Sequence, residues 1–299
     1  MGVCVCVFTN DEGQSLPDCI RSLYFAGLDA HDKIHILTKG CGDDVVSLAY
    51  MLTTADSRIT VHELPISDSA NAWNDYVHRI ADCSIPVHIF IDASVKASAG
   101  TLLAFDRAMQ NAPDSYAGAA LPVTGRSRRK WATQLLKHHY LSKHLYALSN
   151  TAISEFREKN IYLPFEAHGT DGLLSYLLLT NMSGGADDSH DNRITMVEEA
   201  TFEFTSLMPN FHDVKRYWKR LTHYSKRHLQ NQILYRILKK QGVGAMPNTI
   251  NEIYTPATLA SLRPRLDIVN FWFDIATLRQ LNHKAPSLMV PKAAKLKTR

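Results

Sequence analysis

The sequence predicts an α/β protein: a mostly parallel sheet flanked by helices, followed by a mainly helical C-terminal extension. Within residues 3–109, short apolar runs alternate four times with stretches of helical periodicity. Such alternation is typical of parallel strands whose connecting helices cover both faces of a sheet. A long basic stretch follows the last predicted strand. We therefore expect one α/β domain over residues 1–205 and a basic, mainly helical extension over 206–299.

The predicted strands are short and apolar, and the predicted helices carry an apolar stripe. VCVCVF is a Val-rich strand closed by a polar turn, and the segment LPDCIRSLYFAG that follows has apolar side chains at helical spacing. The other early strands are 34–37, 59–64 and 87–91, with helices over 44–54, 69–81 and 100–109. Later we predict a basic loop at 125–130, a helix ending near 140, a strand and a helix within 145–158, a helix over 168–179, a strand over 194–204 and a helix over 211–240.

Three polar segments follow predicted strands at their carboxyl ends. They are Thr9–Gly13, Thr38–Asp44 and Asp92–Lys96, and each contains carboxylates. In open parallel sheets, ligands bind in the crevice outside the carboxyl ends of the strands. The sequence therefore predicts a nucleotide and metal site at this edge.

The composition is that of an ordinary globular protein. Apolar residues make up 45% of the chain and charged residues 21%, and no apolar run approaches the roughly 20 residues that a membrane-spanning helix needs. The first residues lack the basic start and cleavage site of a secretory signal. The five cysteines are an odd number without zinc-ligand spacing, which favours reduced thiols packed as small apolar groups. We expect a cytoplasmic protein.

The charge is distributed unevenly along the chain. Residues 1–210 hold 16 Lys and Arg against 25 Asp and Glu, a net charge of −9, whereas residues 211–299 hold 17 against 4, a net charge of +13. A basic region of this kind indicates an anionic partner. Membrane headgroups, a lipid pyrophosphate and nucleic acid all satisfy that requirement. Peripheral contact of residues 211–299 with the inner face of an anionic membrane is one expectation.

The motifs occur in the order found in one family of enzymes. These are VCVFTNDEGQSLPDCIRSL, IHILTKGCGDD, HELPISDSANAWNDYV, VHIFIDASV, and LYALSNTAISEF followed by LPFEAHGTDGLLSYLL. In order and spacing they resemble the family 2 glycosyltransferases, and the resemblance covers residues 3–205. It implies a GT-A-like catalytic domain over residues 1–205 and an inverting, metal-assisted transfer in polysaccharide biosynthesis. A sugar would pass from a nucleoside diphosphate to a hydroxyl of a glycan or lipid-linked acceptor.

The resemblance also implies roles for individual residues. The residues implied to bind the sugar nucleotide are Thr9, Asn10, Glu12, Asp43, Asn74 and Asp92. Asp92, with Ser94, would hold Mn²⁺ or Mg²⁺, a Lewis acid that stabilises charge on the leaving diphosphate. Asp171 would be the general base that takes the proton of the acceptor hydroxyl. Arg126, His223 and His228 are further candidates for phosphate or metal contacts.

The sequence departs from the family pattern at three places. Ser94 stands where the second Asp of the metal motif is expected, Thr38 and Lys39 stand where many members have Asp, and Thr170 replaces a Glu. A non-catalytic binding protein on a degenerate GT-A scaffold is therefore the alternative. A nucleotidyltransferase is disfavoured by the acidic TNDEGQS turn, and nucleic-acid binding by the acidic residues 1–210.

Overall fold

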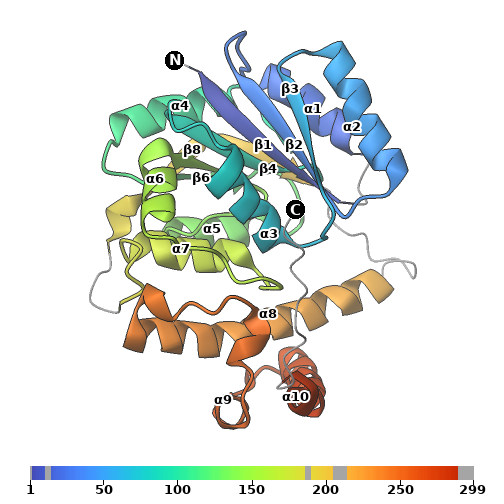
Figure 1. Ribbon diagram of the computed structural model, residues 1–299, viewed down its shortest axis with the longest axis vertical. Coiled ribbons are helices and arrows are strands. Elements are labelled where there is room, and N and C mark those ends of the chain that lie inside the picture. Colours follow the sequence, from blue (N-terminus) through green and yellow to red (C-terminus); the bar gives the residue numbers. More distant parts are fainter. Residues whose placement is uncertain (1, 11–14, 186–189, 205–213, 289–299) are drawn as a thin grey trace. The chain divides into compact units, whose positions relative to one another are not determined.

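The computed structural model describes residues 2–10, 15–185, 190–204 and 214–288. The chain forms two compact units (Figure 1). Unit 1 comprises Met1–Leu163 and Gly169–Ser206, and unit 2 comprises Pro164–His168 and Leu207–Arg299. The segment Pro164–His168 thus belongs to unit 2, although the residues on both sides of it in the sequence belong to unit 1.

Unit 1 is a twisted sheet with helices on both faces (Figure 1). Its strands are β1 Val3–Thr9, β2 Lys33–Lys39, β3 Ile59–Leu64, β4 Val87–Asp92, β5 Val95–Ala97, β6 Ala117–Pro122, β7 Leu145–Ser149 and β8 Ile194–Phe204. Its helices are α1 Leu16–Phe25, α2 Asp43–Ala55, α3 Ser69–Asp75, α4 Thr101–Asn111, α5 Arg128–His138, α6 Asn150–Glu158 and α7 Thr170–Leu179. A π-helical turn, η1 Tyr76–Ile80, continues α3, and a 3₁₀ turn, η2 Asp191–Arg193, precedes β8.

The strand order is β3-β2-β1-β4-β7-β6-β8-β5. β1 pairs in parallel with both β2 and β4, and β2 pairs in parallel with β3. β7 runs antiparallel between β4 and β6, β8 is parallel to β6, and the short β5 is antiparallel to β8. The predicted fold class is confirmed, with the mixed half of the sheet starting at β7.

The side chains of β1 show how the sheet is covered. Successive residues of a strand point to opposite faces. Val3, Val5 and Val7 therefore lie in one core with residues of α1 and α4, whereas Cys4 and Cys6 are buried on the other face. There the Tyr76 hydroxyl donates a hydrogen bond to Cys4 Sγ at 3.1 Å. Both cysteines are free thiols that pack as small side chains.

The first four predicted strands and the helices between them are all present. The predicted helix over 69–81 is α3 followed by a π-helical turn, in which the Ala81 N–H bonds to the Tyr76 carbonyl. The sequence did not indicate β6, AGAALP, because small residues carry little strand preference. Helix α5 begins inside the predicted basic loop, at Arg128.

Unit 2 is helical. It contains α8 Val214–Gln241, α9 Pro256–Ala260 and α10 Ile268–Leu288, with 3₁₀ turns η4 Val243–Ala245 and η5 Ile250–Ile253. Phe165 pairs with Thr249, which joins the segment 164–168 to this unit. Buried apolar side chains from α8 to α10 form its core, including Leu229, Ile233 and Leu281.

Buried polar bonds hold the start of α10 against α8. The Asp274 carboxylate is fully buried and accepts two hydrogen bonds from the Arg265 guanidinium, at 2.8 and 3.0 Å. The Ser225 hydroxyl of α8 donates to the same carboxylate at 2.5 Å. Although burial opposes ionisation, Arg265 and Ser225 hold the pKa of Asp274 below its usual range.

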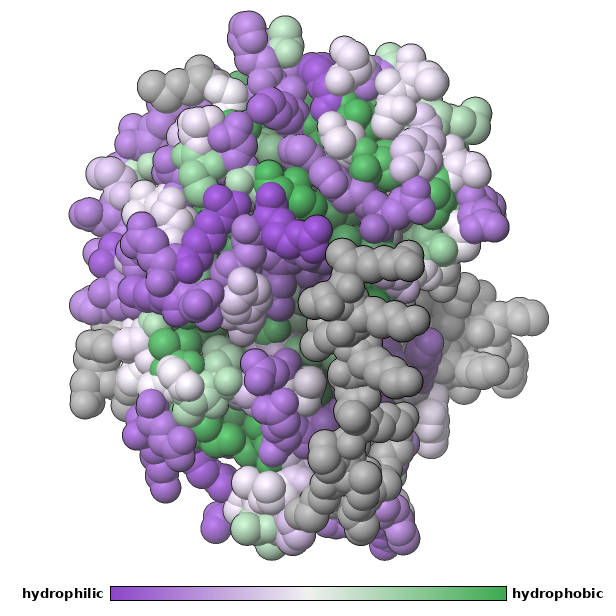
Figure 2. Space-filling model, viewed as in Figure 1, coloured by the Kyte–Doolittle hydropathy of each residue, from purple (hydrophilic) through white to green (hydrophobic). Residues whose placement is uncertain are grey.

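In the described parts of the chain, no helix has the length and apolarity needed to cross a bilayer. Hydrophilic side chains predominate on the face of the molecule seen in Figure 2, and apolar groups appear between them in smaller patches.

Candidate functional site

A polar cavity of about 200 Å³ opens in unit 1 at the carboxyl ends of β1, β2 and β4. It is lined by Phe8, Asn10, Lys39, Ser69, Trp73, Asp92, Lys143, Tyr146, Leu163, Thr170, Asp171 and Leu174. Asn10 follows β1, Lys39 ends β2 and Asp92 ends β4. Because these three strands are parallel neighbours, their ends meet at one edge of the sheet, as the sequence predicted.

Lys39 brings a positive charge into the cavity. Its side chain is buried, and its Nζ donates to the Ser69 hydroxyl at 2.9 Å and lies 6.0 Å from the centre of the Phe8 ring. Gly40 turns the chain away directly afterwards with φ of 59°. A Cβ there would come within 2.8 Å of the Ser67 backbone nitrogen, so this turn requires glycine.

Asp92 is oriented by the residue two places along the chain. The Ser94 hydroxyl and backbone N–H both donate to Asp92 Oδ1, at 2.6 and 3.0 Å. Burial opposes ionisation of Asp92, but Lys143, these two hydrogen bonds and His144 outweigh it and hold the pKa of the carboxyl below its usual range. Asp92 is therefore an anion, and its Oδ1 accepts both hydrogen bonds from Ser94.

The antiparallel direction of β7 brings its first residues to the same edge. The Asp92 N–H donates to the His144 carbonyl at 3.0 Å, which places Lys143 and Tyr146 beside the end of β4. Burial, with smaller contributions that include the Asp171 charge, raises the pKa of Tyr146 well above its usual range. Tyr146 is therefore a neutral phenol in the cavity wall.

Asp171 lies in the first turn of α7. The helix begins after Gly169, whose φ of 73° is readily available only to glycine. The orphan N–H groups and the dipole at a helix start favour a carboxylate there. Asp171 lines the cavity together with Thr170 and Leu174. It lies close enough to Tyr146 for its charge to contribute to the raised pKa of that phenol.

The cavity gathers three of the residues predicted from the sequence: Asn10, Asp92 and Asp171. Asn10 Oδ1 is buried and has no hydrogen-bond partner within the part of the chain that the structure describes. Thr9 is buried just before it, and its hydroxyl donates to the Asn10 carbonyl at 3.2 Å. Glu12 lies outside the described residues.

The other predicted residues lie elsewhere or act indirectly. The Asn74 side chain bonds both to the carbonyl and to the N–H of Leu163, each at 2.9 Å, and so fixes a residue of the cavity wall. Asp43 is exposed at the start of α2, and Arg126 is exposed before α5. Neither is among the lining residues.

His223 and His228 belong to α8 in unit 2. The His223 ring meets the His168 ring edge-on with centroids 4.8 Å apart, and His228 bonds to Gln232 at 2.8 Å. Their predicted contact with phosphate or metal stays a prediction.

Several lining residues were missed by the sequence interpretation, notably Lys143, Tyr146, Trp73 and Ser69. Lys39 was noticed only as a departure from a family pattern. A lysine at the end of an apolar strand, next to a turn glycine, is a signal that could have marked it. Lys143 carries no comparable signal, because its position depends on where the antiparallel β7 enters the sheet.

The residues fit a divalent cation only in part. Among the described residues, no three acidic, histidine or cysteine side chains are grouped so as to hold an ion by themselves. Asp92 offers one carboxylate oxygen, and Mg²⁺-type sites commonly combine one or two carboxylates with substrate phosphates and water. A cation at Asp92 would therefore bind together with its substrate.

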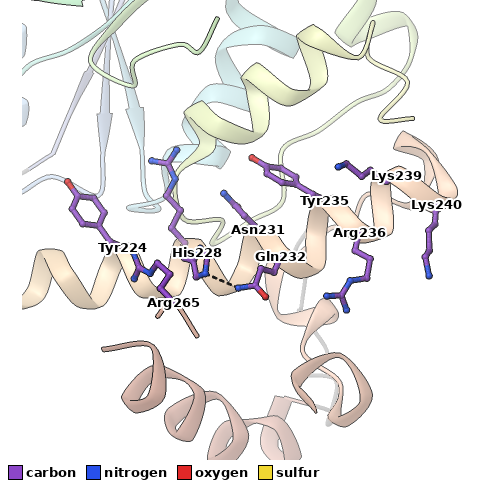
Figure 3. A pocket seen from close by; sticks show the side chains of 10 residues that line it. Tyr224, His228, Asn231, Gln232, Tyr235, Arg236, Lys239, Lys240 and Arg265 are labelled. Atoms are coloured by element: carbon purple, nitrogen blue, oxygen red, sulfur yellow. Dashed lines mark hydrogen bonds between the residues drawn. The ribbon is translucent and has the colours of Figure 1, made fainter. Parts of the chain in front are cut away.

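Unit 2 has a larger and more open hollow, of about 760 Å³, along α8. Its lining is basic and contains no carboxylate: Tyr224, Arg227, His228, Asn231, Gln232, Tyr235, Arg236, Lys239, Lys240 and Arg265. Figure 3 shows Asn231, Tyr235 and Lys239 projecting from one side of α8, and Arg236 and Lys240 from the other.

Comparison with known proteins finds similarity in structure. No family model and no curated protein sequence matches the chain. The mannosyltransferase PcManGT from Pyrobaculum calidifontis, solved with GDP-Man and Mn²⁺, is similar with a TM-score of 0.60 and 14% identity, over 95% of this chain and 75% of that one. Residues 1–349 of S. aureus TarS, solved with UDP-GlcNAc, give 0.53 and 11% identity, over 96% and 92%. The fold is that of the GT-A glycosyltransferases.

Proposed function

We propose that this protein is a glycosyltransferase of family 2 type that transfers a hexosyl group from a nucleoside diphosphate to a hydroxyl acceptor. The observation that carries the proposal is the cavity at the strand ends of a GT-A fold, where two carboxylates and two lysines meet. The structures of similar fold include one with GDP-Man and one with UDP-GlcNAc, which supports a sugar nucleotide as the ligand.

The lysines suit the leaving group. Breaking the bond between the sugar and the diphosphate leaves negative charge on the phosphate oxygens, and fixed positive charges in a partly buried site stabilise it. Lys39 is buried beside Ser69, and Lys143 lies close enough to Asp92 to lower its pKa. We infer that both ammonium groups face the diphosphate. Asn10, with its buried Oδ1, is then a polar contact for the nucleoside.

Asp171 is the proposed general base. The acceptor hydroxyl must lose its proton as it attacks the anomeric carbon, and a carboxylate within hydrogen-bond reach can take that proton. We propose that the hydroxyl attacks from the side opposite to the diphosphate held by Lys39 and Lys143, which inverts the anomeric configuration, as the resemblance to the family 2 glycosyltransferases implies. Tyr146, a neutral phenol, can donate a hydrogen bond to the sugar or the acceptor.

Asp92 is the residue that would hold Mn²⁺ or Mg²⁺, with donor phosphates and water as the remaining ligands. The bound ion would act as a Lewis acid toward the diphosphate. Since the Ser94 hydroxyl donates to Asp92 Oδ1, we propose that Ser94 contributes to metal binding by orienting this carboxylate. Arg126, His223 and His228 remain proposed contacts for phosphate or metal, and Thr9, Glu12, Asp43 and Asn74 remain proposed parts of the nucleotide side.

The acceptor and the location of the enzyme are the finer parts of the proposal. We propose a glycan or lipid-linked saccharide as the acceptor, with a role in polysaccharide biosynthesis. The net charge of +13 in residues 211–299 supports work at the inner face of an anionic membrane.

The test is a thermal-shift and hydrolysis screen of UDP-, GDP-, dTDP- and CMP-sugars, with and without Mn²⁺. We expect one donor to stabilise the protein, with binding weakened about tenfold or more in Lys143→Met and metal dependence lost in Asp92→Asn. Lys137→Met, an exposed lysine of α5, is the matched control and should bind like the wild type. If no donor binds, the enzyme proposal is wrong and a degenerate scaffold is the better interpretation.

A further inference from the structure

We propose that the first turns of α10, with the basic surface of α8, form a membrane-docking surface that inserts into an anionic lipid bilayer. The surface consists of Leu266, just before α10, and of Ile268, Val269, Phe271 and Trp272 in its first turns, and we call it the α10 ridge. This goes beyond the proposed transferase activity, because every residue of the ridge lies in unit 2.

The ridge is strongly exposed for such apolar residues. Leu266 is 94% exposed, Ile268 80% and Trp272 70%. Ile268 and Trp272 are four residues apart, so they lie one above the other on the same side of the helix. Soluble proteins rarely expose large apolar side chains in one contiguous group, and such groups commonly mark interaction sites.

The opposite side of α10 is already used for packing within unit 2. Phe273, Asp274 and Thr277 are buried, and Asp274 is fixed by Arg265 and by Ser225 of α8. The first two turns of the helix therefore have one buried side, which carries Phe273 and Asp274, and one apolar side that faces solvent. The Arg265–Asp274 pair fixes which side faces out.

An aromatic residue of α8 extends the ridge. The Trp218 ring contacts the Phe273 ring with centroids 4.7 Å apart, yet Trp218 remains 64% exposed. Val269 lies one helical turn before Phe273 and is 53% exposed, so it lies at the border between the exposed and the packed sides of α10. Tryptophan is enriched at the boundary between lipid and water, where its apolar ring and its N–H both find suitable surroundings.

The charges beside the ridge indicate which partner it meets. Helix α8 contains nine Lys and Arg and no Asp or Glu. Lys219 and Arg220 are exposed next to Trp218, and Arg263 is exposed just before the ridge. The basic hollow of Figure 3 ends at Arg265, which adjoins Leu266. An apolar ridge beside cations matches an anionic bilayer, which offers acyl chains and phosphates together.

One carboxylate interrupts the ridge. Asp267 Oδ1 accepts a hydrogen bond from the Asn270 N–H at 3.0 Å, so this side chain caps the start of α10. Hydrogen bonds from Asn270 and the charge of Arg265 lower the pKa of Asp267. Its charge is thus compensated locally, at the edge where headgroups would lie.

A second copy of this chain fits the surface less well. A symmetric dimer places the same patch of each copy against the other. The basic surfaces of both α8 helices would then approach each other, whereas an anionic bilayer attracts them. A soluble polyanion would satisfy the cations but would leave the apolar ridge in water.

The experiment is sedimentation of the full chain with vesicles of phosphatidylcholine alone or mixed in equal parts with phosphatidylglycerol. We expect binding to the anionic vesicles, with a blue shift of tryptophan fluorescence, and at least tenfold weaker binding for the double variant Ile268→Ser/Trp272→Ser. The variant Arg236→Gln/Lys240→Gln should bind several-fold more weakly, with a smaller dependence on salt.

The matched control is Met51→Ser in α2 of unit 1, where Met51 is 67% exposed, and it should bind like the wild type. Donor hydrolysis in vesicle-free solution should be unchanged in the ridge variant, so a failure here is distinct from a failure of the transferase proposal. Absence of binding to anionic vesicles, or equal binding by the ridge variant, overturns the proposal. A dimer that the ridge variant converts to a monomer in light scattering also overturns it and assigns the ridge to a second copy.

Discussion

The two units place their unusual residues in opposite ways. In unit 1 the charged side chains of Lys39 and Asp92 are gathered at one cavity at the strand ends. In unit 2 the most exposed apolar side chains are those of Leu266, Ile268 and Trp272, in the first turns of α10 and just before it. The charge follows the same division, with −9 in residues 1–210 and +13 in residues 211–299.

This difference separates two kinds of task. A buried charge is costly unless a partner compensates it, so charges gathered at strand ends indicate a bound polar ligand. Exposed apolar side chains are costly in water, so a group of them indicates a surface that becomes covered. We therefore interpret unit 1 as the unit proposed to carry out sugar transfer and unit 2 as the unit proposed to attach the protein to a membrane. Three measurements test that division, in order of expected effect.

The largest effect is expected at Asp171. Asp171→Asn should lower the rate of sugar transfer by about 10²- to 10⁴-fold, because the amide cannot accept the acceptor proton. Donor binding by thermal shift should change little, since the amide keeps the size of the carboxylate. Asp18→Asn is the control, because Asp18 is also a first-turn acid of a helix, but exposed and paired with Lys96. Equal activity of the two variants would remove Asp171 from the mechanism.

A smaller effect, on stability, is expected in unit 2. Asp274→Ala leaves the Arg265 guanidinium without its buried partner, which should cost about 3–5 kcal/mol. In scanning calorimetry of the full chain, the transition of unit 2 should fall by roughly 10 °C or more, with that of unit 1 unchanged. Asp267→Ala removes only an exposed helix cap of the same helix and should lower the transition far less. A single unfolding transition that shifts as a whole would show that the two units do not unfold separately, and would contradict this prediction.

The third effect concerns pH and unit 1. His88 is fully buried on β4 beside the Tyr76 hydroxyl, at 2.9 Å, and burial lowers the pKa of His88 to about 4. Because the folded pKa lies below the unfolded value of about 6.5, the neutral ring stabilises the fold at neutral pH. That contribution falls as the pH drops from about 6.5 to 4, by about 3 kcal/mol at most.

The fluorescence of Trp218→Phe/Trp272→Phe reports on unit 1 alone, because its remaining tryptophans are Trp73 and Trp131. In that background His88→Gln should show a flatter dependence of stability on pH between 6.5 and 4. An unchanged pH dependence would show that His88 does not govern acid unfolding, and would point instead to the His35–His62 pair.

The sequence predicted the fold correctly where strands and helices alternate along the chain, because their local patterns are enough to indicate a parallel sheet there. The parallel strands β1 to β4 were predicted because apolar runs and helical stripes alternate there, and their ends carry Asn10 and Asp92. The approach of Asp171 to the same cavity followed from resemblance and from no local pattern. Lys143 and Tyr146 were missed because their place depends on β7 running antiparallel beside β4, which no short-range pattern records.

The α10 ridge was missed for a different reason. Ile268, Val269, Phe271, Trp272 and Phe273 form a nearly continuous apolar run in the sequence, which by itself predicts a buried segment. The buried pair of Arg265 and Asp274, together with the packing of Phe273 and Thr277, fixes one side of α10 inside unit 2 and leaves the other facing out. Periodicity describes a helix but does not identify its neighbours.

The segment Pro164–His168 bears on how such a protein could be shortened or recombined. Phe165 exchanges hydrogen bonds with Asn248 and Ile250, so unit 2 contains a piece of chain that comes from between α6 and α7. A truncation after residue 206 would remove the partners of that piece and leave it unpaired just ahead of the turn that carries Asp171. Unit 2 therefore cannot be removed by a simple C-terminal truncation. A chimera that exchanges it has to exchange both Pro164–His168 and Leu207–Arg299.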